Sequence, residues 1–297
     1  MFTRRHPYLF ALLVMAGLGT VTMIFFSVIV VAMSGDKVDY GGEKVGVIEL
    51  VGTIVDSKQI VQQIKDFREA ETVKSIVIRI DSPGGGVGPS QEIYREIQKT
   101  IAHKKVIASM GSVAASGGYY VAAAADGIIA NPGTITGSIG VIMGYTNFEE
   151  LMQKIGLQPV VIKSGEFKDM GSPVREMKEK EREFLEAFTQ KIHHQFIRDI
   201  AQGRNVEIDR IEPIADGRIF TGEEAIAMGL VDRLGNFQDA VQWAGELGGI
   251  KGEVKTVYPE KERPSFIEYV MESALKIISR NSLRTGLRPE ARLELAP

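Results

Sequence analysis

The sequence contains no cysteine, and this absence excludes several kinds of chemistry at once. A chain without thiols forms no disulfides, binds no zinc through cysteine and has no thiolate nucleophile. Histidine is scarce, with four residues in 297. The formal net charge is −3, and no block of lysine and arginine is present that could follow a phosphate backbone. We therefore expect no nucleic-acid partner.

The N-terminal region is the longest uncharged part of the chain. Residues Tyr8 to Met33 form 26 positions without a charge, preceded by Arg4 and Arg5. This length can cross a bilayer, whereas a cleavable signal peptide has a shorter apolar stretch and a small-residue cleavage site close behind it. We expect an uncleaved signal anchor in the cytoplasmic (inner) membrane, with the N-terminus inside and the body on the periplasmic or extracytoplasmic side. The alternative is a long signal peptide that is removed, and the body is exported in either case.

After a polar linker at residues 34–44, short β-branched runs alternate with helical segments, which is typical of an α/β domain. Several of the runs are apolar on both faces and suit a buried, largely parallel sheet. The expected strands are Val45–Leu50, Ser75–Ile80, Lys105–Met110, Gly127–Ala130, Gly140–Met143 and Pro159–Lys163. The expected helices are Ser57–Glu71, Ser90–His103, Gly117–Ala125, Phe148–Ile155 and Lys178–Gln202.

Two features are expected in the C-terminal part. Thr221 and Glu224 have the spacing of a capping box, which predicts a short helix that ends near Gly229. Residues Pro264–Arg280 carry an apolar stripe at helical spacing, suited to packing on the body or another subunit, or to lying on a membrane. The tail Asn281–Pro297 is expected to be flexible.

Two glycine-rich segments each follow a strand and precede a helix. The first, Asp81–Gly88, lacks the spacing of a phosphate-binding loop, so an oxyanion hole and a plain tight turn remain open. The second, Gly111–Tyr120, places Ser116 between small residues at a helix start, where N–H groups point at developing negative charge. An ordinary N-cap serine is the alternative. A nucleophile elbow is disfavoured because five residues separate Ser116 from Met110, the last residue of the expected strand.

A nucleophilic serine needs a base. His6 precedes the apolar span, and His103, His193 and His194 lie in polar helical surroundings. A lysine can serve if it is neutral, which requires surroundings that lower a lysine pKa from about 10.4. Lys168 is the candidate, because it lies among Gly, Phe and Met in the loop Ser164–Pro173. The alternative is a loop lysine paired with Asp169.

Together these segments resemble the signal peptide peptidase A family. The likeness runs from about Val45 to Gly235 and follows five ordered blocks. The blocks are D-S-P-G-G-G from Asp81, A-A-S-G-G-Y-Y from Ala114, T-G-S-I-G-V from Thr136, S-G-E-F-K-D-M-G-S-P from Ser164 and A-D-G-R from Ala215. The length is similar to that of the short, single-span form of the family.

The resemblance implies a ClpP/crotonase-like α/β fold of repeated ββα units and a Ser/Lys dyad without cofactor or metal. Ser116 would be the nucleophile, Lys168 the base, Ser138 a hydrogen-bond partner of the lysine, and Gly85 an oxyanion donor. We add the Gly117 N–H as a second donor on geometry. The family forms a ring or dome, and in its short form the serine and lysine of one site come from neighbouring subunits. The substrates would be signal peptides left in the membrane, or other apolar peptides.

The resulting domain prediction is a cytoplasmic stub and transmembrane anchor at 1–34, a protease domain at 45–258, and a C-terminal helix and tail at 264–297. Two rival functions remain open. An α/β-hydrolase would use His193 or His194 as the base for the serine. An inactive membrane scaffold would use only the anchor, the oligomer and the apolar C-terminal helix.

Overall fold

The computed structural model of the chain describes residues 7–33 and 42–259. The chain divides into two units, Met1–Gly42 and Glu43–Pro297, and each is described by itself. The first unit contains helix α2 (Pro7–Met33). Its segment Pro7–Ser27 has a mean hydropathy of 2.3 and is long and apolar enough to cross a membrane. Twenty-one helical residues span about 32 Å, close to the thickness of about 30 Å of a bilayer core.

The second unit is built on one eight-stranded sheet with the order β6-β5-β3-β2-β1-β8, in which β4 also pairs with β3 and β7 also pairs with β4. All ladders are parallel except β5–β6. The strands are β1 Lys44–Val51, β2 Val73–Ser82, β3 Lys105–Ala115, β4 Gly127–Ala130, β5 Ile135–Gly137, β6 Ile219–Thr221, β7 Arg233–Leu234 and β8 Lys255–Val257.

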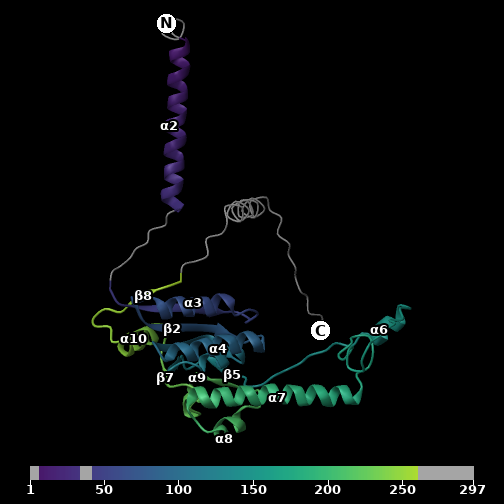
Figure 1. Cartoon of the computed structure of the whole chain (residues 1–297). Coiled ribbons are helices and arrows are strands. Elements are labelled where there is room, and N and C mark those ends of the chain that lie inside the picture. The colour runs from purple at the N-terminus through teal and green to yellow at the C-terminus, as the bar shows by residue number, and fades with distance from the viewer. Residues whose placement is uncertain (1–6, 34–41, 260–297) are drawn as a thin grey trace, which may run out of the picture. The chain divides into compact units, whose positions relative to one another are not determined.

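The helices of this unit cover both faces of the sheet (Figure 1). They are α3 Lys58–Glu69, α4 Val87–Ile101, α5 Gly117–Ala122, α6 Glu149–Lys154, α7 Glu179–Arg204, α8 Ile208–Ile211, α9 Gly222–Ala227 and α10 Phe237–Leu247, with a 3-10 turn at Glu212–Ile214. Ile76, Ile78 and Ile80 of β2 pack in the larger core with α3, α4, α5 and α7, while Val77 faces the smaller core under α10. This alternation follows from the two-residue period of a strand.

Most of the expected elements are present, with shifted ends. The helices expected from Ser57, Ser90, Gly117, Phe148 and Lys178 all form, and β1, β2 and β4 lie where the β-branched runs predicted them. The capping box at Thr221 is confirmed, because its hydroxyl accepts from the Glu224 N–H and the Glu224 carboxylate accepts from the Thr221 N–H at 2.8 Å. The helix and tail predicted after residue 263 lie outside the described residues.

Three expectations for strands are wrong. β3 continues five residues beyond Met110, because Val113–Ala115 pair with β5 and the Asp81 carboxylate accepts from the Val113 N–H at 3.1 Å. Gly140–Met143 and Pro159–Lys163 form no strand, since neither segment has a ladder partner among the described residues.

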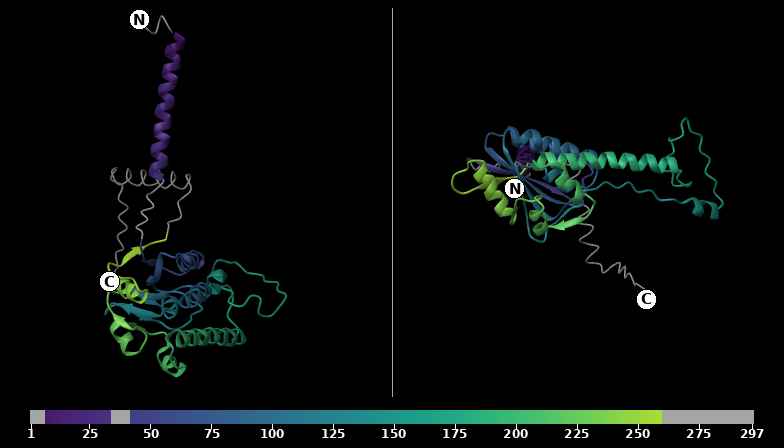
Figure 2. Two further views of the ribbon diagram at one scale, coloured as in Figure 1. Left: turned by 60° about the vertical axis from the view of Figure 1, so that its left-hand side comes forward. Right: turned by 90° about the horizontal axis from the view of Figure 1, so that it is seen from below.

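Both of these unpaired segments belong to the long connection between β5 and α7. Figures 1 and 2 show this connection running out from the sheet, with α6 beyond the end of α7, and returning to the start of that helix. We call residues 140–177 the arm.

Candidate active site

Ser116 directly follows the last residue of β3 and immediately precedes α5. Its backbone has φ 53° and ψ −120°, a region that residues with a side chain rarely adopt. The N–H of Ser116 donates to the carbonyl oxygen of Gly137 at 2.9 Å, which holds the turn against β5. Ser116 occupies the N-cap position, but its hydroxyl makes no capping hydrogen bond. The expected gap of five residues between the strand and Ser116 is therefore wrong, because β3 ends at Ala115 and the serine comes straight off its strand, as in a nucleophile elbow.

The loop after β2 lies against this turn. Gly84 has φ 103°, and a Cβ added there would come within 2.8 Å of the Ser116 Cβ. Gly85 forms an isolated parallel bridge with Ile54, whose N–H donates to the Gly84 carbonyl at 2.9 Å and whose carbonyl accepts from Gly86 at 2.7 Å. A Cβ on Gly85 would meet the Ile54 backbone nitrogen at 2.6 Å. The sequence Gly84-Gly85-Gly86 thus permits a close backbone approach that side chains would block.

Two backbone N–H groups stand beside the serine without an acceptor. Within the described part of the chain, neither the Gly85 N–H nor the Gly117 N–H donates to any group. The two lie close together, since a Cβ built on Gly117 would be 3.2 Å from the Gly85 nitrogen. Unengaged N–H groups in such a position can hydrogen-bond a negatively charged oxygen.

Ser138 occupies the same position after β5 that Ser116 occupies after the neighbouring strand β3. It directly follows β5, its φ is 51°, and its N–H donates to the carbonyl of Arg218 at 2.8 Å. The turn that contains Arg218 is tied to the same place by the Gly217 N–H, which donates to the Ile139 carbonyl at 3.1 Å. The A-D-G-R block of the sequence therefore supports the backbone around Ser138.

A cavity of about 110 Å³ opens beside Ser116. Apart from Ser116 and the ring of Tyr120, its lining is apolar or glycine: Gly85, Val87, Gly140, Val141, Ile142, Ile192 and Phe196. The Tyr120 hydroxyl is directed elsewhere, since it donates to the Asp199 carboxylate and accepts from Gln91 at 3.3 Å. Such a cavity can hold one apolar side chain of a substrate.

Tyr120 and Phe196 both line this cavity and were not predicted from the sequence as site residues. Their ring centroids are 4.5 Å apart, and Tyr94 meets Tyr120 edge-on at 5.3 Å. Burial and the acceptance of its proton by the Asp199 carboxylate raise the pKa of Tyr120 above its ordinary value. The hydroxyl therefore stays protonated. The only sequence signal was the pair of tyrosines that follows Ser116-Gly117-Gly118.

Lys168 lies in the arm and not at the Ser116 cavity. It is exposed, and its neighbour Phe167 packs on Phe184 of α7 with ring centroids 5.5 Å apart. Ile192, the nearest residue of this helix that lines the cavity, is eight residues further along, or about 12 Å at 1.5 Å per residue. That distance is several times the length of a hydrogen bond, about 3 Å. One chain by itself therefore does not bring the predicted base to the predicted nucleophile.

The predicted ion-pair alternative for Lys168 is wrong, because other residues hold Asp169. Lys163 Nζ lies 2.5 Å from one Asp169 oxygen and Arg175 Nε 2.9 Å from the other. Arg175 also donates to Glu181, whose side chain is buried, at 2.6 Å. These bonds hold the pKa of Asp169 well below its usual range, chiefly through Arg175 and then Lys163, and Arg175 lowers the pKa of Glu181. The loop around Lys168 is thus fixed while its amine remains available.

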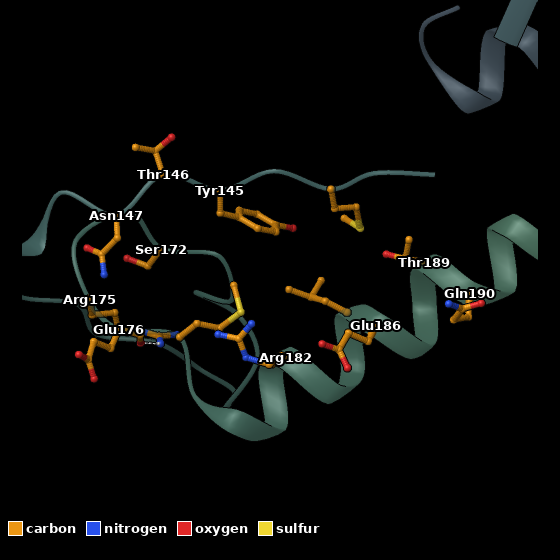
Figure 3. Close-up of a pocket in the computed structure, with 13 residues that line it drawn as sticks. Tyr145, Thr146, Asn147, Ser172, Arg175, Glu176, Arg182, Glu186, Thr189 and Gln190 are labelled. Carbon is orange, nitrogen blue, oxygen red and sulfur yellow. Dashed lines mark hydrogen bonds between the residues drawn. The ribbon is translucent and has the colours of Figure 1, made fainter. Parts of the chain in front are cut away.

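A larger hollow of about 710 Å³ lies between the arm and the first half of α7. Figure 3 shows Tyr145 and Thr146 on one side and Glu186, Thr189 and Gln190 on the other. It shares no lining residue with the Ser116 cavity. It therefore belongs to the docking of the arm rather than to the candidate catalytic centre.

The histidines of α7 are not placed at the cavity. His193 and His194 follow Ile192, but neither lines the space beside Ser116, and His194 lines a separate hollow with Arg198 and Ile208. Nothing in the described geometry pairs either ring with the serine.

These observations define a class of protein: a serine peptidase with a Clp protease-like α/β fold, whose serine lies on a strained strand-to-helix turn beside free N–H groups. The chain belongs to peptidase family S49, which residues 98–251 match, while residues 44–135 match the Clp protease family. It is a serine peptidase, and the resemblance to signal peptide peptidase A is confirmed.

Three relatives illustrate the match. A putative protease of Synechocystis sp. is 43% identical over 224 residues, 74% of this chain and 80% of that protein. The chloroplastic serine protease SPPA of Arabidopsis thaliana is 37% identical over 221 residues, which cover 74% of this chain and 33% of that protein. A putative signal peptide peptidase SppA of Enterococcus faecium is 38% identical over 183 residues, 60% of this chain and 52% of that protein.

Proposed function

We propose that this serine peptidase uses a Ser/Lys dyad in which Ser116 of one subunit is paired with Lys168 of a neighbouring subunit. The observation that supports it best is the turn itself. Ser116 stands at φ 53° with its hydroxyl unbonded, beside the free N–H groups of Gly85 and Gly117. Because Lys168 lies toward the far end of α7 in its own chain, a second copy is the natural source of the base.

The mechanism follows from these parts. A neutral lysine amine takes the Ser116 proton as Oγ attacks a peptide carbonyl. The Gly85 and Gly117 N–H groups then stabilise the oxyanion, and the lysine gives its proton to the departing amine. Water attacks the acyl-enzyme in the same way and frees the serine. Ser138, at the end of the adjacent strand, orients the lysine amine through its hydroxyl.

The proposed substrates are signal peptides released from secreted proteins and other apolar peptides. The apolar lining of the cavity beside Ser116 supports such side chains, and one relative is named as a putative signal peptide peptidase. Helix α2 would anchor the enzyme in the cytoplasmic membrane with residues 45–258 as the protease domain on the outer side. In spheroplasts, external protease should then degrade the body while a cytoplasmic marker survives, and alkaline extraction should leave the chain in the membrane pellet. If the body is instead protected from external protease, it lies on the cytoplasmic side and the proposed topology is wrong.

The dyad is tested on the full-length enzyme in detergent with an apolar peptide. Ser116→Ala and Lys168→Ala should each lower kcat/KM at least about 1,000-fold, because the members of a catalytic unit act together. The double change His193→Ala with His194→Ala should leave cleavage near the wild-type rate. Loss in the histidine variant together with survival in Lys168→Ala would instead favour the Ser/His hydrolase.

The sharing of sites is tested by mixing. Co-assembled Ser116→Ala and Lys168→Ala subunits should regain part of the activity, because some junctions unite an intact serine with an intact lysine. Verified mixed oligomers that stay inactive would mean that each subunit builds its own site. If both single variants of the pure enzyme keep full activity, the dyad is excluded altogether.

A further inference from the structure

Two segments of the arm have the residues of β-strands but no strand partner. Gly140–Met143 and Pro159–Lys163 carry Val141, Ile142, Val160, Val161 and Ile162, the β-branched types that favour strands. No backbone hydrogen bond joins residues 140–146 or 158–164 to any residue that the structure describes. Backbone N–H and C=O groups are obligatory hydrogen-bonding groups. Both segments therefore offer unpaired edges of the kind that recruit another chain.

The side chains of these segments are unusually exposed. Ile142 is 95% exposed, Ile162 97% and Val160 86%, whereas Val161 between the last two is 53% exposed. Val161 also lines a small hollow with Arg175, so exposure alternates along 160–162 with the period of two that defines a strand. A row of large apolar side chains facing water marks an interaction surface.

The two segments sit at the two halves of the incomplete site. Gly140, Val141 and Ile142 line the cavity beside Ser116. Lys163 is five residues before Lys168, and its amine is bonded to the Glu166 carbonyl at 2.9 Å and to Asp169 at 2.5 Å. The turn that connects the second segment to Lys168 is therefore internally fixed. Whatever pairs with Pro159–Lys163 also determines where Lys168 is placed.

We infer that Pro159–Lys163 of one copy pairs as a β-strand with Gly140–Met143 of a second copy and thereby delivers Lys168 of the first to Ser116 of the second. The inference rests on the proposed Ser/Lys dyad and names the contact that assembles it. The second copy is the occupant because the chain itself supplies both unpaired edges, and because the neighbour of Lys168, Phe167, packs on Phe184, about 12 Å along α7 from the nearest residue that lines the cavity of the same chain. A ladder of four residues at about 3.3 Å each covers about 13 Å, enough to fix the register of this junction.

The test uses the absence of cysteine from the chain. Single-cysteine full-length variants at Val141, Ile142 and Met143 are mixed, one at a time, with single-cysteine variants at Val160, Val161 and Ile162, and oxidised after assembly. Because paired positions bring Cα atoms within about 7 Å, at least one combination should give a mixed disulfide dimer on a non-reducing gel. The nine combinations cover the possible registers.

A matched control uses Leu247→Cys, which is 43% exposed at the end of α10, where the next residue, Gly248, lies against Ser75 near the start of β2. Its mixtures with the 160–162 variants should give at least tenfold less dimer. If none of the nine combinations exceeds this control, the strand pairing is wrong. If the six positions cross-link only when two cysteines are placed in one chain, giving a faster monomer band, the segments pair within the subunit and the inference also fails.

The outcome is separable from that of the proposed function. If Lys168→Ala is inactive but no inter-subunit cross-link forms, the Ser/Lys dyad is supported and the proposed strand pairing is wrong. If the cross-links form efficiently but Lys168→Ala keeps its activity, the strand pairing is supported as an interface. The inference that this pairing brings the catalytic base to Ser116 is then wrong.

Discussion

Ser116 and Ser138 directly follow paired residues of two adjacent parallel strands, and both have a positive φ. Ala115 of β3 is opposite Gly137 of β5, and the serines that follow have φ values of 53° and 51°. Both backbones are fixed by N–H donation, Ser116 to Gly137 and Ser138 to Arg218. Residues with a Cβ pay about 1–2 kcal/mol for a positive φ, so the fold keeps strain at adjacent strand ends where the chemistry is proposed.

This strain predicts opposite stabilities for two inactive variants of Ser116. Ser116→Gly and Ser116→Ala both remove the hydroxyl, but only glycine relieves the positive φ. We expect the glycine variant to exceed the alanine variant by about 1–2 kcal/mol in free energy of unfolding. Urea denaturation of the two proteins measures the difference. The same pair at Ser109, a buried residue of β3 without positive φ, should favour alanine. Equal stabilities at Ser116 would show that its backbone is not strained.

The second prediction concerns the glycine loop. A Cβ on Gly85 would overlap the Ile54 backbone, at 2.6 Å from its nitrogen and 2.7 Å from its carbonyl carbon, neither of which is a flexible side chain. Gly85→Ala should therefore displace the proposed oxyanion donor and lower kcat about 100-fold or more, the cost of one lost donor. Steady-state kinetics with an apolar peptide measures this.

Gly88→Ala is the matched control three residues away. Gly88 lies in α4, and a Cβ there would meet nothing within 4 Å. This change should leave kcat unaltered and stabilise the protein by up to about 1 kcal/mol, because alanine is the better helix former. Full activity in Gly85→Ala would remove Gly85 from the oxyanion hole.

Much of the fold could be predicted from local patterns. The β-branched run at Ser75–Ile80 and the helix from Lys178 are both present, and the run, which is apolar on both faces, lies in a buried, largely parallel sheet as expected. The glycine-rich segments also lie at strand-to-helix junctions as expected. Where a pattern is regular and its partner lies nearby, local sequence is sufficient.

The errors arose where structure depends on distant partners. The small residues of Gly111–Ala115 have little strand propensity, yet β5 and the Asp81 carboxylate hold them in β3. Conversely, Pro159–Lys163 has strand propensity but no partner in its own chain. The meeting of Tyr120 with Phe196 joins residues 76 positions apart in the sequence. Neither a period nor a motif encodes such a contact, so these two cavity residues could not be predicted from the sequence.

The third prediction is a size limit at the cavity beside Ser116. Its volume of about 110 Å³ is below the roughly 150 Å³ of an apolar cavity that accepts benzene. Peptides with Leu or Val at the residue before the cleaved bond should therefore exceed those with Phe by about tenfold in kcat/KM. Asp should be cleaved least, because its charge would be buried unpaired.

Replacing Phe196 tests which residue sets that limit. Phe196→Leu should raise kcat/KM for Phe peptides relative to Leu peptides, because the smaller leucine side chain enlarges the cavity. The control is Phe188→Leu on the same helix, a residue 44% exposed that stacks on Phe184 and does not line the cavity. An unchanged Leu-to-Phe ratio in Phe196→Leu would mean that the cavity does not receive that side chain.

The last prediction is an acid-induced release of the loop that carries Lys168. Arg175 and Lys163 lower the pKa of Asp169, and Arg175 lowers the pKa of Glu181. A carboxyl group whose pKa is lower in the folded state stabilises that state fully above its unfolded pKa, near 4, and loses this contribution as pH falls below it. Amide hydrogen exchange of residues 163–175, corrected for intrinsic rates, should therefore rise relative to β2 between pH 5 and pH 3.

At pH 7 the variant Arg175→Gln should reproduce this opening, because it removes the group that binds both carboxylates. Lys154→Gln is the control, since Lys154 is exposed in α6 of the same arm and lies 3.9 Å from Glu150 at the surface, where ion pairs contribute little. A loop that opens in acid but stays closed in Arg175→Gln would place the acid-sensitive group elsewhere. Because this loop holds Lys168, Arg175→Gln should also reduce peptide cleavage, and Lys154→Gln should not.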